Sequence, residues 1–437
     1  MVSKLEKSRM AQSRNDRYVV ISADGHAGAE IHDYKQYLES KWHAEFDPWV
    51  SNFKDPWDDF EISDRKFGAA SGGPDSTFSW DGRKRNAALE QEGIVAEVLF
   101  PNTAPPFFPS GVLTAAAPRT RADYERRWAG LKAYNRWLVD FCAELPGRRA
   151  GVAQIYLNDV DDAVEELHWI KKAGLTGGVL LPCDAPGELV PLYYPRYDRI
   201  WAVCADLDIP VHRHGSVPGE PASAESGTAG TAIGLIESPF FGRRGLAHLI
   251  FAGVFERYPK LKFVTTELGA GWVPSYLAEL DALHRAAGMK GGVVEYFVGE
   301  SARALRKRPS EYFTSNCYLG ASFLTGAECA QRHQIGVDRI MWGSDMPHRE
   351  GTYPYSAEAM RAAFAGVPPA EVRLMLSGTA ASVYGFDLAL LQPLADRIGP
   401  TVGQIMTPLD RWPEFPTQTV TAPLSREWMP GEIPTPG

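Results

Sequence analysis

Residues 18–26 read YVVISADGH, and this stretch decides how the rest of the chain is interpreted. The first six residues are β-branched, aromatic or small, which is typical of a buried strand. Asp24, Gly25 and His26 follow directly. Because side chains two residues apart on a strand point to the same side, Asp24 and His26 are expected to face one common space. The stretch therefore predicts a buried strand with a polar site at its carboxyl end.

The same arrangement, a short β-rich run followed by a helical stretch, recurs along the chain. Eight strands are expected, at residues 18–23, 95–100, 151–156, 177–181, 209–214, 261–267, 312–319 and 339–343. Helical stretches such as 86–92, 161–173, 197–207 and 247–258 carry apolar residues at helical spacing. Strands that alternate with helices predict parallel pairing. Eight units, with no GxGxxG after the first strand, favour an α/β fold of the (β/α)8 or TIM-barrel type over a Rossmann sheet.

Three long insertions interrupt the alternation, at residues 27–85, 101–122 and 215–243. Each follows a strand, so all three are expected on the C-terminal face, where TIM-barrel sites are built. We predict one barrel domain over residues 1–389. From residue 390 the chain becomes Pro-rich, and residues 390–437 are expected to form a C-terminal arm that wraps the domain or a neighbouring subunit. A homodimer is therefore predicted.

Composition excludes several classes of protein. The chain has 437 residues, a formal net charge of −9 and 44% hydrophobic residues, with no clustered basic surface for nucleic acid. Its five cysteines form no CxxC pair, which argues against a disulfide scaffold. The polar first residues and the lack of a run of about 20 apolar residues predict no membrane span. A cytoplasmic enzyme with a small-molecule substrate is expected.

Residues of the types that bind metals stand at the ends of four expected strands. Buried carboxylates need partners, and a cation is the simplest partner for several carboxylates and neutral imidazoles at one site. The predicted metal ligands are Asp24, His26, His212, His214, Glu267, Asp345 and His348.

Some of the polar residues near the expected site are given other roles. Glu97 on the second strand faces inward if Val95 and Leu99 do, and it is interpreted as an extra ligand, a proton relay or a partner of Arg85. Asp345, Glu267 and Glu97 are the predicted catalytic residues.

Five segments carry a resemblance to a known family. They are DGH at 24–26, PVHRH at 210–214, WGSD at 342–345, FAGVFERYPKLKFV at 251–264 and LYYPRYDRIWAVCADLDIPV at 192–211. From about Tyr18 to Leu388 the chain resembles the amidohydrolase-2 branch of the amidohydrolase superfamily, which implies a metal-dependent TIM barrel. It departs from the family pattern at Asp24, where the first His of HxH usually stands, and at Glu267, where strand 6 carries a His. No Lys ends strand 4.

Three carboxylates and four histidines exceed what one zinc ion uses, and they suit two octahedral ions. This ligand pattern, with EVLF followed by PNTAPPFF, resembles the TIM-barrel non-haem diiron monooxygenases of platensimycin and platencin biosynthesis. That resemblance implies two Fe ions, O2 and an external reductant or electron donor. It also implies hydroxylation of an unactivated C–H bond in a CoA-linked apolar substrate, such as a diterpenoid, in antibiotic biosynthesis. One iron would take Asp24, His26, His214 and Asp345, and the other His212, Glu267 and His348.

Two alternatives stay open. In the first, the chain is a hydrolase or decarboxylase with one Zn or Mn ion, and Asp345 is the general base for a metal-bound water. In the second, it is a metal-binding protein without catalysis, because a fold does not fix a function. The monooxygenase is preferred because it explains Glu267, His212 and His348 together.

Overall fold

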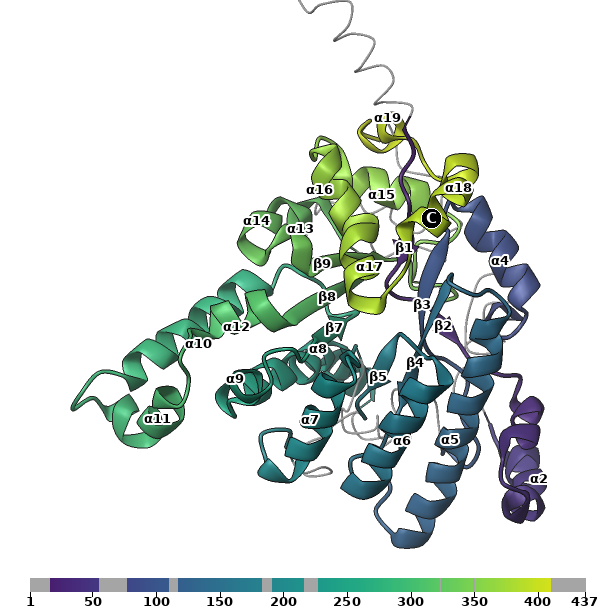
Figure 1. The fold of residues 1–437 in the computed structure, drawn as a ribbon, viewed down its shortest axis with the longest axis horizontal. Helices are drawn as coiled ribbons and strands as arrows, with labels where there is room; N and C mark the ends of the chain where they lie inside the picture. Colours follow the sequence, from purple (N-terminus) through teal and green to yellow (C-terminus); the bar gives the residue numbers. More distant parts are fainter. Residues whose placement is uncertain are drawn as a thin grey trace, which may run out of the picture.

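A computed structural model describes residues 16–54, 77–109, 117–182, 191–215, 227–322, 324–348 and 350–409. Its centre is one parallel sheet in the order β1-β3-β4-β5-β6-β7-β8-β9, with the short β2 beside β3 (Figure 1). The strands are β1 (Ile21–Ser22), β2 (His26–Ala27), β3 (Ala96–Pro101), β4 (Arg149–Gln154), β5 (Gly178–Leu180), β6 (Val211–His214), β7 (Phe263–Thr266), β8 (Cys317–Ser322) and β9 (Ile340–Gly343). Neighbouring strands follow one another along the chain, as the alternation predicts.

The first and last strands meet and nearly close the sheet into a barrel. Ala23 N donates to Trp342 O at 2.8 Å, and Asp345 N donates to Asp24 O at 2.8 Å. Just beyond the strands, His26 N donates to Met346 O at 2.7 Å. The predicted TIM-barrel architecture is confirmed. This seam between β1 and β9 also brings together the two segments that carry Asp24, His26 and Asp345.

Helices form the outer layer. Those before β6 are η1 (Ile31–Tyr37), η2 (Ser40–Trp42), α2 (His43–Asn52), η3 (Thr77–Ser79), α4 (Gly82–Gln91), α5 (Arg121–Ala143), α6 (Val160–Ala173), η4 (Pro195–Tyr197) and α7 (Asp198–Asp206). Between β6 and β9 lie α8 (Gly227–Phe251), α9 (Val254–Arg257), α10 (Val273–Ala287), α11 (Val293–Arg303), α12 (Pro309–Asn316), α13 (Gly326–Ala330), α14 (Arg332–Ile335) and η5 (Val337–Arg339). After β9 come α15 (Ser356–Phe364), α16 (Pro369–Arg373), η6 (Leu374–Gly378), α17 (Thr379–Tyr384), α18 (Leu388–Ile398) and α19 (Val402–Ile405). Among the described residues, no helix is long and apolar enough to span a membrane.

Helix α6 illustrates how the sequence sets these elements. The Asp159 side chain caps the first turn, accepting from Asp161 N at 2.9 Å. Gly174 ends the helix in the left-handed region, with φ 83°. Ala163, Leu167 and Ile170 lie on one face and are buried, so the helix packs on the sheet through a regular apolar stripe.

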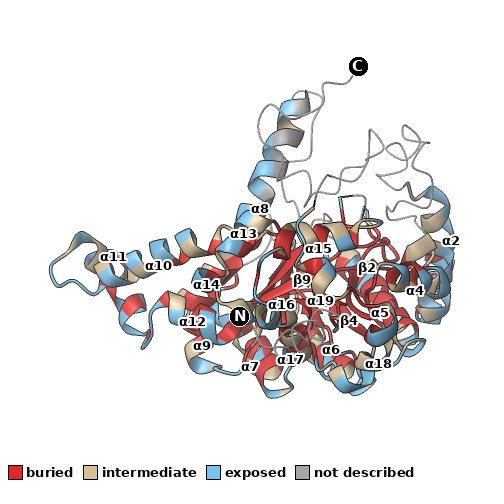
Figure 2. Cartoon of the chain, turned by 90° about the horizontal axis from the view of Figure 1, so that it is seen from above, coloured by how far each residue is buried: buried red, intermediate tan, exposed pale blue. Residues whose placement is uncertain are grey.

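Buried residues are concentrated in the strands and in the helices packed around them (Figure 2). They form two hydrophobic clusters. Inward side chains of the strands, such as Ile21, Val98 and Val264, fill the barrel together with Tyr384 of α17 and Leu391 of α18. A larger cluster lies between the strands and the outer helices. The site described below is therefore held by a tightly packed frame.

Three expectations differ from the structure. Residues 312–316 belong to α12, because Pro309 and Glu311 start a helix there, although Tyr312 and Phe313 favour a strand. Residues 227–243, expected as loop, lie in α8. The boundary predicted at residue 390 falls inside α18, whose Leu391 and Ala395 are buried in the core. The rest of the predicted arm, residues 410–437, lies outside the described residues.

The carboxylate of Glu92, after α4, gives a pH-dependent prediction. Its Oε2 accepts from Ser356 N at 2.9 Å, and burial, with the nearby Glu358 charge, raises its pKa. A carboxyl whose pKa is raised by folding contributes its stability below the unfolded pKa and loses it as pH rises. Glu92→Gln keeps the acceptor without the charge. We expect its melting temperature to exceed that of wild type by about 1–3 °C at pH 8 and to match it near pH 4. A lower melting temperature at pH 8 would contradict this.

Candidate metal centre

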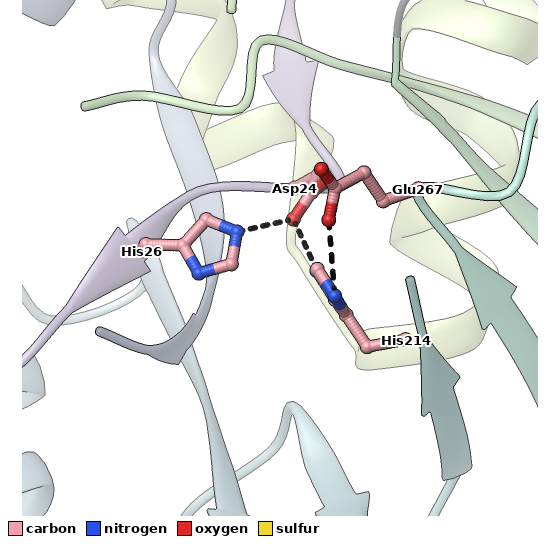
Figure 3. A group of neighbouring side chains, drawn as sticks. All are labelled: Asp24, His26, His214 and Glu267. Carbon is pink, nitrogen blue, oxygen red and sulfur yellow. Dashed lines mark hydrogen bonds and ion pairs between the residues drawn. The ribbon is translucent and has the colours of Figure 1, made fainter. Parts of the chain in front are cut away.

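The carboxylate of Asp24, at the end of β1, lies at the centre of the site. Its Oδ2 accepts from Ser322 Oγ of β8. Its Oδ1 lies 3.4 Å from His26 Nε2 and 3.3 Å from His214 Nε2 (Figure 3). Burial opposes the charged form, yet the two facing imidazoles lower the pKa of Asp24 below its usual range. Asp24 is therefore an anion that faces two ring nitrogens.

His26 directs its Nε2 atom toward this site. Its Nδ1 donates to Pro101 O at 3.0 Å, so the lone pair of the neutral ring is on Nε2. Nε2 is buried without a hydrogen-bond partner and lies 3.0 Å from Asp345 Oδ1. Burial acts to lower the pKa of His26, but Asp24 and Asp345 outweigh it and raise the pKa to about 10. The negative potential that favours a proton at Nε2 also favours a metal cation there.

His214, at the end of β6, is oriented in the same manner. Its Nδ1 contacts Gly215 O at 2.9 Å and Glu267 Oε2 at 3.2 Å. Its Nε2 is the nitrogen that faces Asp24 (Figure 3). A histidine whose outer nitrogen is held by a carbonyl and a carboxylate is typical of a metal ligand. Glu267 therefore touches the nitrogen that orients the ring.

Asp345, after β9, is completely buried, and neither carboxylate oxygen has a hydrogen-bond partner. His348 Nδ1 lies 3.0 Å from its Oδ1, and the opposite nitrogen of that ring contacts Asn102 Oδ1 at 3.1 Å. The His348 ring also lies against the His26 ring, with centroids 3.9 Å apart. A completely buried carboxylate whose nearest polar neighbours are two imidazole nitrogens indicates a cation at this site.

Glu267 and Asp345 both adopt left-handed backbone conformations, with φ 56° and 58°. Non-glycine residues rarely do so, and such strain clusters at functional sites. Burial, followed by the charges of Asp345 and Asp24, raises the pKa of Glu267 well above its ordinary value. This carboxyl therefore favours its protonated form more than an exposed glutamate does.

The donor atoms fit a divalent metal ion. Two groups of closely spaced donors share His26: one adds Asp24, His214 and Glu267, and the other adds Asp345 and His348. Ligand atoms about 2.1 Å from one ion lie about 3.0–3.4 Å apart. The spacings from Asp24 to the two imidazoles, and from His26 to Asp345, fall in that range. Oxygen and imidazole donors without thiolate suit Mn²⁺ or Zn²⁺.

Two predicted site residues lie outside these groups. His212 Nε2 donates to Gly177 O at 2.8 Å, and burial lowers its pKa to about 3, so it is a neutral ring beneath the site. Glu97 is held by Arg85, whose Nη2 lies 2.7 Å from Oε2. Of the roles expected for Glu97, the structure places it as the partner of Arg85.

Two further neighbours were missed by the sequence analysis. Ser322 holds Asp24, and exposed Glu350 lies in a group with Glu267, Asp345 and His348. A serine at a strand end and a loop glutamate carry no sequence signal of their own. Asn102 Nδ2 donates to Ser79 Oγ at 2.8 Å, and Asn102 Oδ1 contacts His348 Nε2 at 3.1 Å.

The glycine of WGSD also serves this site. A Cβ at Gly343 would lie 2.7 Å from Asp24 Cβ and 3.2 Å from Ser322 Oγ. We expect Gly343→Ala to push Asp24 aside and to weaken Mn²⁺ binding about tenfold or more in a titration of the metal-free protein. Gly288→Ala is the control, because its Cβ would meet nothing closer than 3.5 Å. Equal Mn²⁺ affinity in the two variants would contradict the prediction.

The sequence model of the family described as Amidohydrolase matches residues 42–386. The chain belongs to this family. The resemblance inferred from DGH, PVHRH and WGSD is therefore confirmed at the level of the family.

Several relatives of this amidohydrolase are decarboxylases. Gamma-resorcylate decarboxylase of Rhodococcus jostii (strain RHA1) is 29% identical over 251 residues, which cover 54% of this chain and 72% of the relative. The 5-carboxyvanillate decarboxylase of Novosphingobium aromaticivorans DSM 12444, solved with manganese, has a TM-score of 0.59 at 20% identity, covering 84% of this chain and 97% of that one. Dihydroxybenzoic acid decarboxylase of Polaromonas sp. JS666 was solved with manganese and 2-nitroresorcinol. It has a TM-score of 0.56 at 19% sequence identity, covering 84% of this chain and 97% of that one.

These relatives overturn the predicted diiron monooxygenase, which is wrong. The predicted O2-dependent oxidoreductase activity and the predicted role in antibiotic biosynthesis are therefore wrong as well. Nothing supports two Fe ions, an external reductant, an electron donor or a CoA-linked substrate. That prediction rested on the number of carboxylates and imidazoles in the sequence. In the structure, His212 Nε2 donates to Gly177 O, and Glu267 Oε2 lies 3.2 Å from His214 Nδ1.

Proposed function

We propose that this amidohydrolase is a metal-dependent decarboxylase of a hydroxylated aromatic carboxylic acid and uses one Mn²⁺ or Zn²⁺ ion. The observation that carries the proposal is the convergence of Asp24 Oδ1 and the Nε2 atoms of His26 and His214, beside the completely buried carboxylate of Asp345. The decarboxylase relatives support the reaction class. Asp24, His26, His214 and Asp345 would hold the ion.

When bound, the ion would supply a Lewis acid that binds and polarises the oxygens of the acid. In the reaction, the bond between the ring and the carboxylate breaks, CO2 leaves, and the electron pair stays on the ring carbon. That carbon then takes a proton. The chain therefore has to orient the acid, exclude bulk water and supply one proton.

Glu267 and His348 are the proton-holding groups beside the donor cluster. The Glu267 carboxyl favours its protonated form, because burial and neighbouring carboxylates raise its pKa. His348 is fixed between Asp345 and Asn102. We assign Glu267 the supply of the proton from its carboxyl oxygen, and His348 the orientation of Asp345.

The ring of Phe100 gives the site an apolar wall. Phe100 of β3 is completely buried, and its ring lies 4.7 Å from the His214 ring and 5.2 Å from the His212 ring, between centroids. A low local dielectric strengthens the attraction between the carboxylates and a cation.

The first test is metal content together with CO2 release. We expect about one Mn²⁺ or Zn²⁺ per chain, and CO2 release from one or more hydroxybenzoates that is lost on chelation and restored by Mn²⁺. In D2O the product should carry one deuterium at the carbon that bore the carboxylate. The proposal would be refuted if the wild-type chain binds no divalent ion. It would also be refuted if the metal-loaded chain releases no CO2 from any of the hydroxybenzoates tested. The homodimer and the cytoplasmic location remain predictions.

A further inference from the structure

A completely buried guanidinium lies directly behind the DGH segment. Arg85 belongs to α4, and its side chain is fully inaccessible to solvent. Nη1 donates to His26 O at 2.7 Å and to Phe78 O at 3.0 Å. Nη2 donates to Glu97 Oε2 at 2.7 Å and to Met346 O at 3.1 Å, while Nε donates to Glu97 Oε1 at 2.9 Å. All five N–H groups of the guanidinium therefore have acceptors.

Two of these acceptors belong to the segments that carry the donor cluster. His26 is itself a candidate ligand, and Met346 directly follows Asp345. Met346 O also accepts from His26 N at 2.7 Å. One rigid side chain thus ties together the main chains of two segments that lie far apart in the sequence, at the place where their ligands face each other.

The carboxylate of Glu97 neutralises the buried positive charge of Arg85. It is 2% exposed and binds Arg85 through both carboxylate oxygens, and Arg149 Nε lies 3.7 Å from its Oε1. Removing one partner of such a pair leaves an uncompensated buried charge, which is strongly unfavourable. The carboxylate therefore fixes where the guanidinium sits.

Gly25 shows how closely the pair approaches the ligands. A Cβ on Gly25 would lie 3.0 Å from Arg85 Nη2, 3.3 Å from Glu97 Oε2 and 3.4 Å from Met346 O. A side chain at Gly25 would therefore press on the ion pair and displace it by a few tenths of an ångström, which favours glycine at the centre of DGH.

We propose that Arg85, held by Glu97, is a positioning residue that sets the spacing between His26 and Asp345 for the metal ion. It acts through the carbonyls of His26 and Met346 and not by touching the substrate. A lysine keeps the positive charge but has a single ammonium without the planar fork, so it cannot reach both carbonyls and both Glu97 oxygens. The inference rests on the metal centre of the proposed function.

The test is Mn²⁺ binding to the full-length chain after removal of bound metal by a chelator. We expect Arg85→Lys to weaken Mn²⁺ binding 10- to 100-fold and Glu97→Gln to weaken it about 3- to 10-fold. The matched control is Arg136→Lys, because Arg136 pairs with the buried Glu166 on the outer helices, away from the donor cluster. We expect this control to bind Mn²⁺ like wild type.

Melting temperatures of the metal-free chains separate positioning from general stability. The inference requires that Mn²⁺ affinity falls in Arg85→Lys by far more than in any control of equal melting temperature. A folded Arg85→Lys chain that binds Mn²⁺ within twofold of wild type would overturn it. If Arg85→Lys does not fold, Glu97→Gln decides by the same comparison. A wild-type chain that binds no divalent ion refutes the metal centre itself, which is a different result.

Discussion

Asp345→Asn is expected to reduce turnover at least about 1000-fold and to remove most of the bound metal. The amide has the shape of the carboxylate but no charge, while both carboxylate oxygens of Asp345 lie buried without hydrogen-bond partners. Asparagine is also tolerated in the left-handed backbone that this position adopts, with φ 58°. The change therefore tests charge with little disturbance of the main chain.

The measurement is metal content and CO2 release of the purified variant, with the melting temperature recorded for the metal-free chain. Asp338→Asn is the control, since Asp338 is exposed and pairs only with Arg339 among the described residues. We expect the control to keep wild-type metal content and turnover. Wild-type turnover in Asp345→Asn would show that this carboxylate takes no part in the reaction.

Glu267→Gln is expected to keep about one metal ion per chain and to slow turnover by about 100- to 1000-fold. Glutamine can still accept from His214 Nδ1, which Glu267 Oε2 approaches at 3.2 Å, so the ring keeps its orientation. It has no titratable proton to give to the ring carbon. Loss of turnover without loss of metal is the signature of a proton-supplying group.

A neighbouring carboxylate provides the control. Glu350 lies in the same group of acidic residues and histidines but is exposed, and Glu350→Gln is expected to change turnover less than threefold. If Glu267→Gln instead loses the metal, Glu267 is a direct ligand and the proton has another source. Retained metal with wild-type turnover would remove Glu267 from the reaction altogether.

The alternation of strands and helices was sufficient to predict the barrel and to bring five of the candidate site residues to one face of it. Asp24, His26, His214, Glu267 and Asp345 stand at strand ends, and parallel strands bring those ends to one face. Period-two spacing also predicts that Asp24 and His26 share a side, and both face the site. These features depend on local sequence alone.

The roles of the residues could not be predicted in the same way. The sequence predicts His212 and His214 equally well as metal ligands. In the structure, however, His212 Nε2 donates to Gly177 O, whereas His214 Nε2 faces Asp24. Glu97 and Glu267 are both predicted catalytic carboxylates, but Glu97 pairs with the guanidinium of Arg85 from α4. Which atom meets which partner depends on packing between elements far apart in the chain.

Two predicted element boundaries were wrong for a different reason. Tyr312 and Phe313 favour a strand, but Pro309 and the paired Arg308 and Glu311 at the start of α12 make a helix. Near residue 390, Pro393 suggests the end of regular structure, although α18 runs through it with Leu391 buried. Local capping outweighs strand propensity at the first place, and tertiary burial keeps the helix intact at the second.

The seam between β1 and β9 has a consequence for how the protein is made. Asp24 and Asp345 lie about 320 positions apart in the sequence, and they meet only where the first strand contacts the last. At roughly 5–20 residues per second, a ribosome needs roughly 15–60 s to pass from one to the other. Throughout that interval the nascent chain carries an open sheet edge and an unfinished set of ligands. The complete set of candidate ligands thus exists only after synthesis has passed β9, so the proposed metal ion would be loaded late in the biogenesis of this protein.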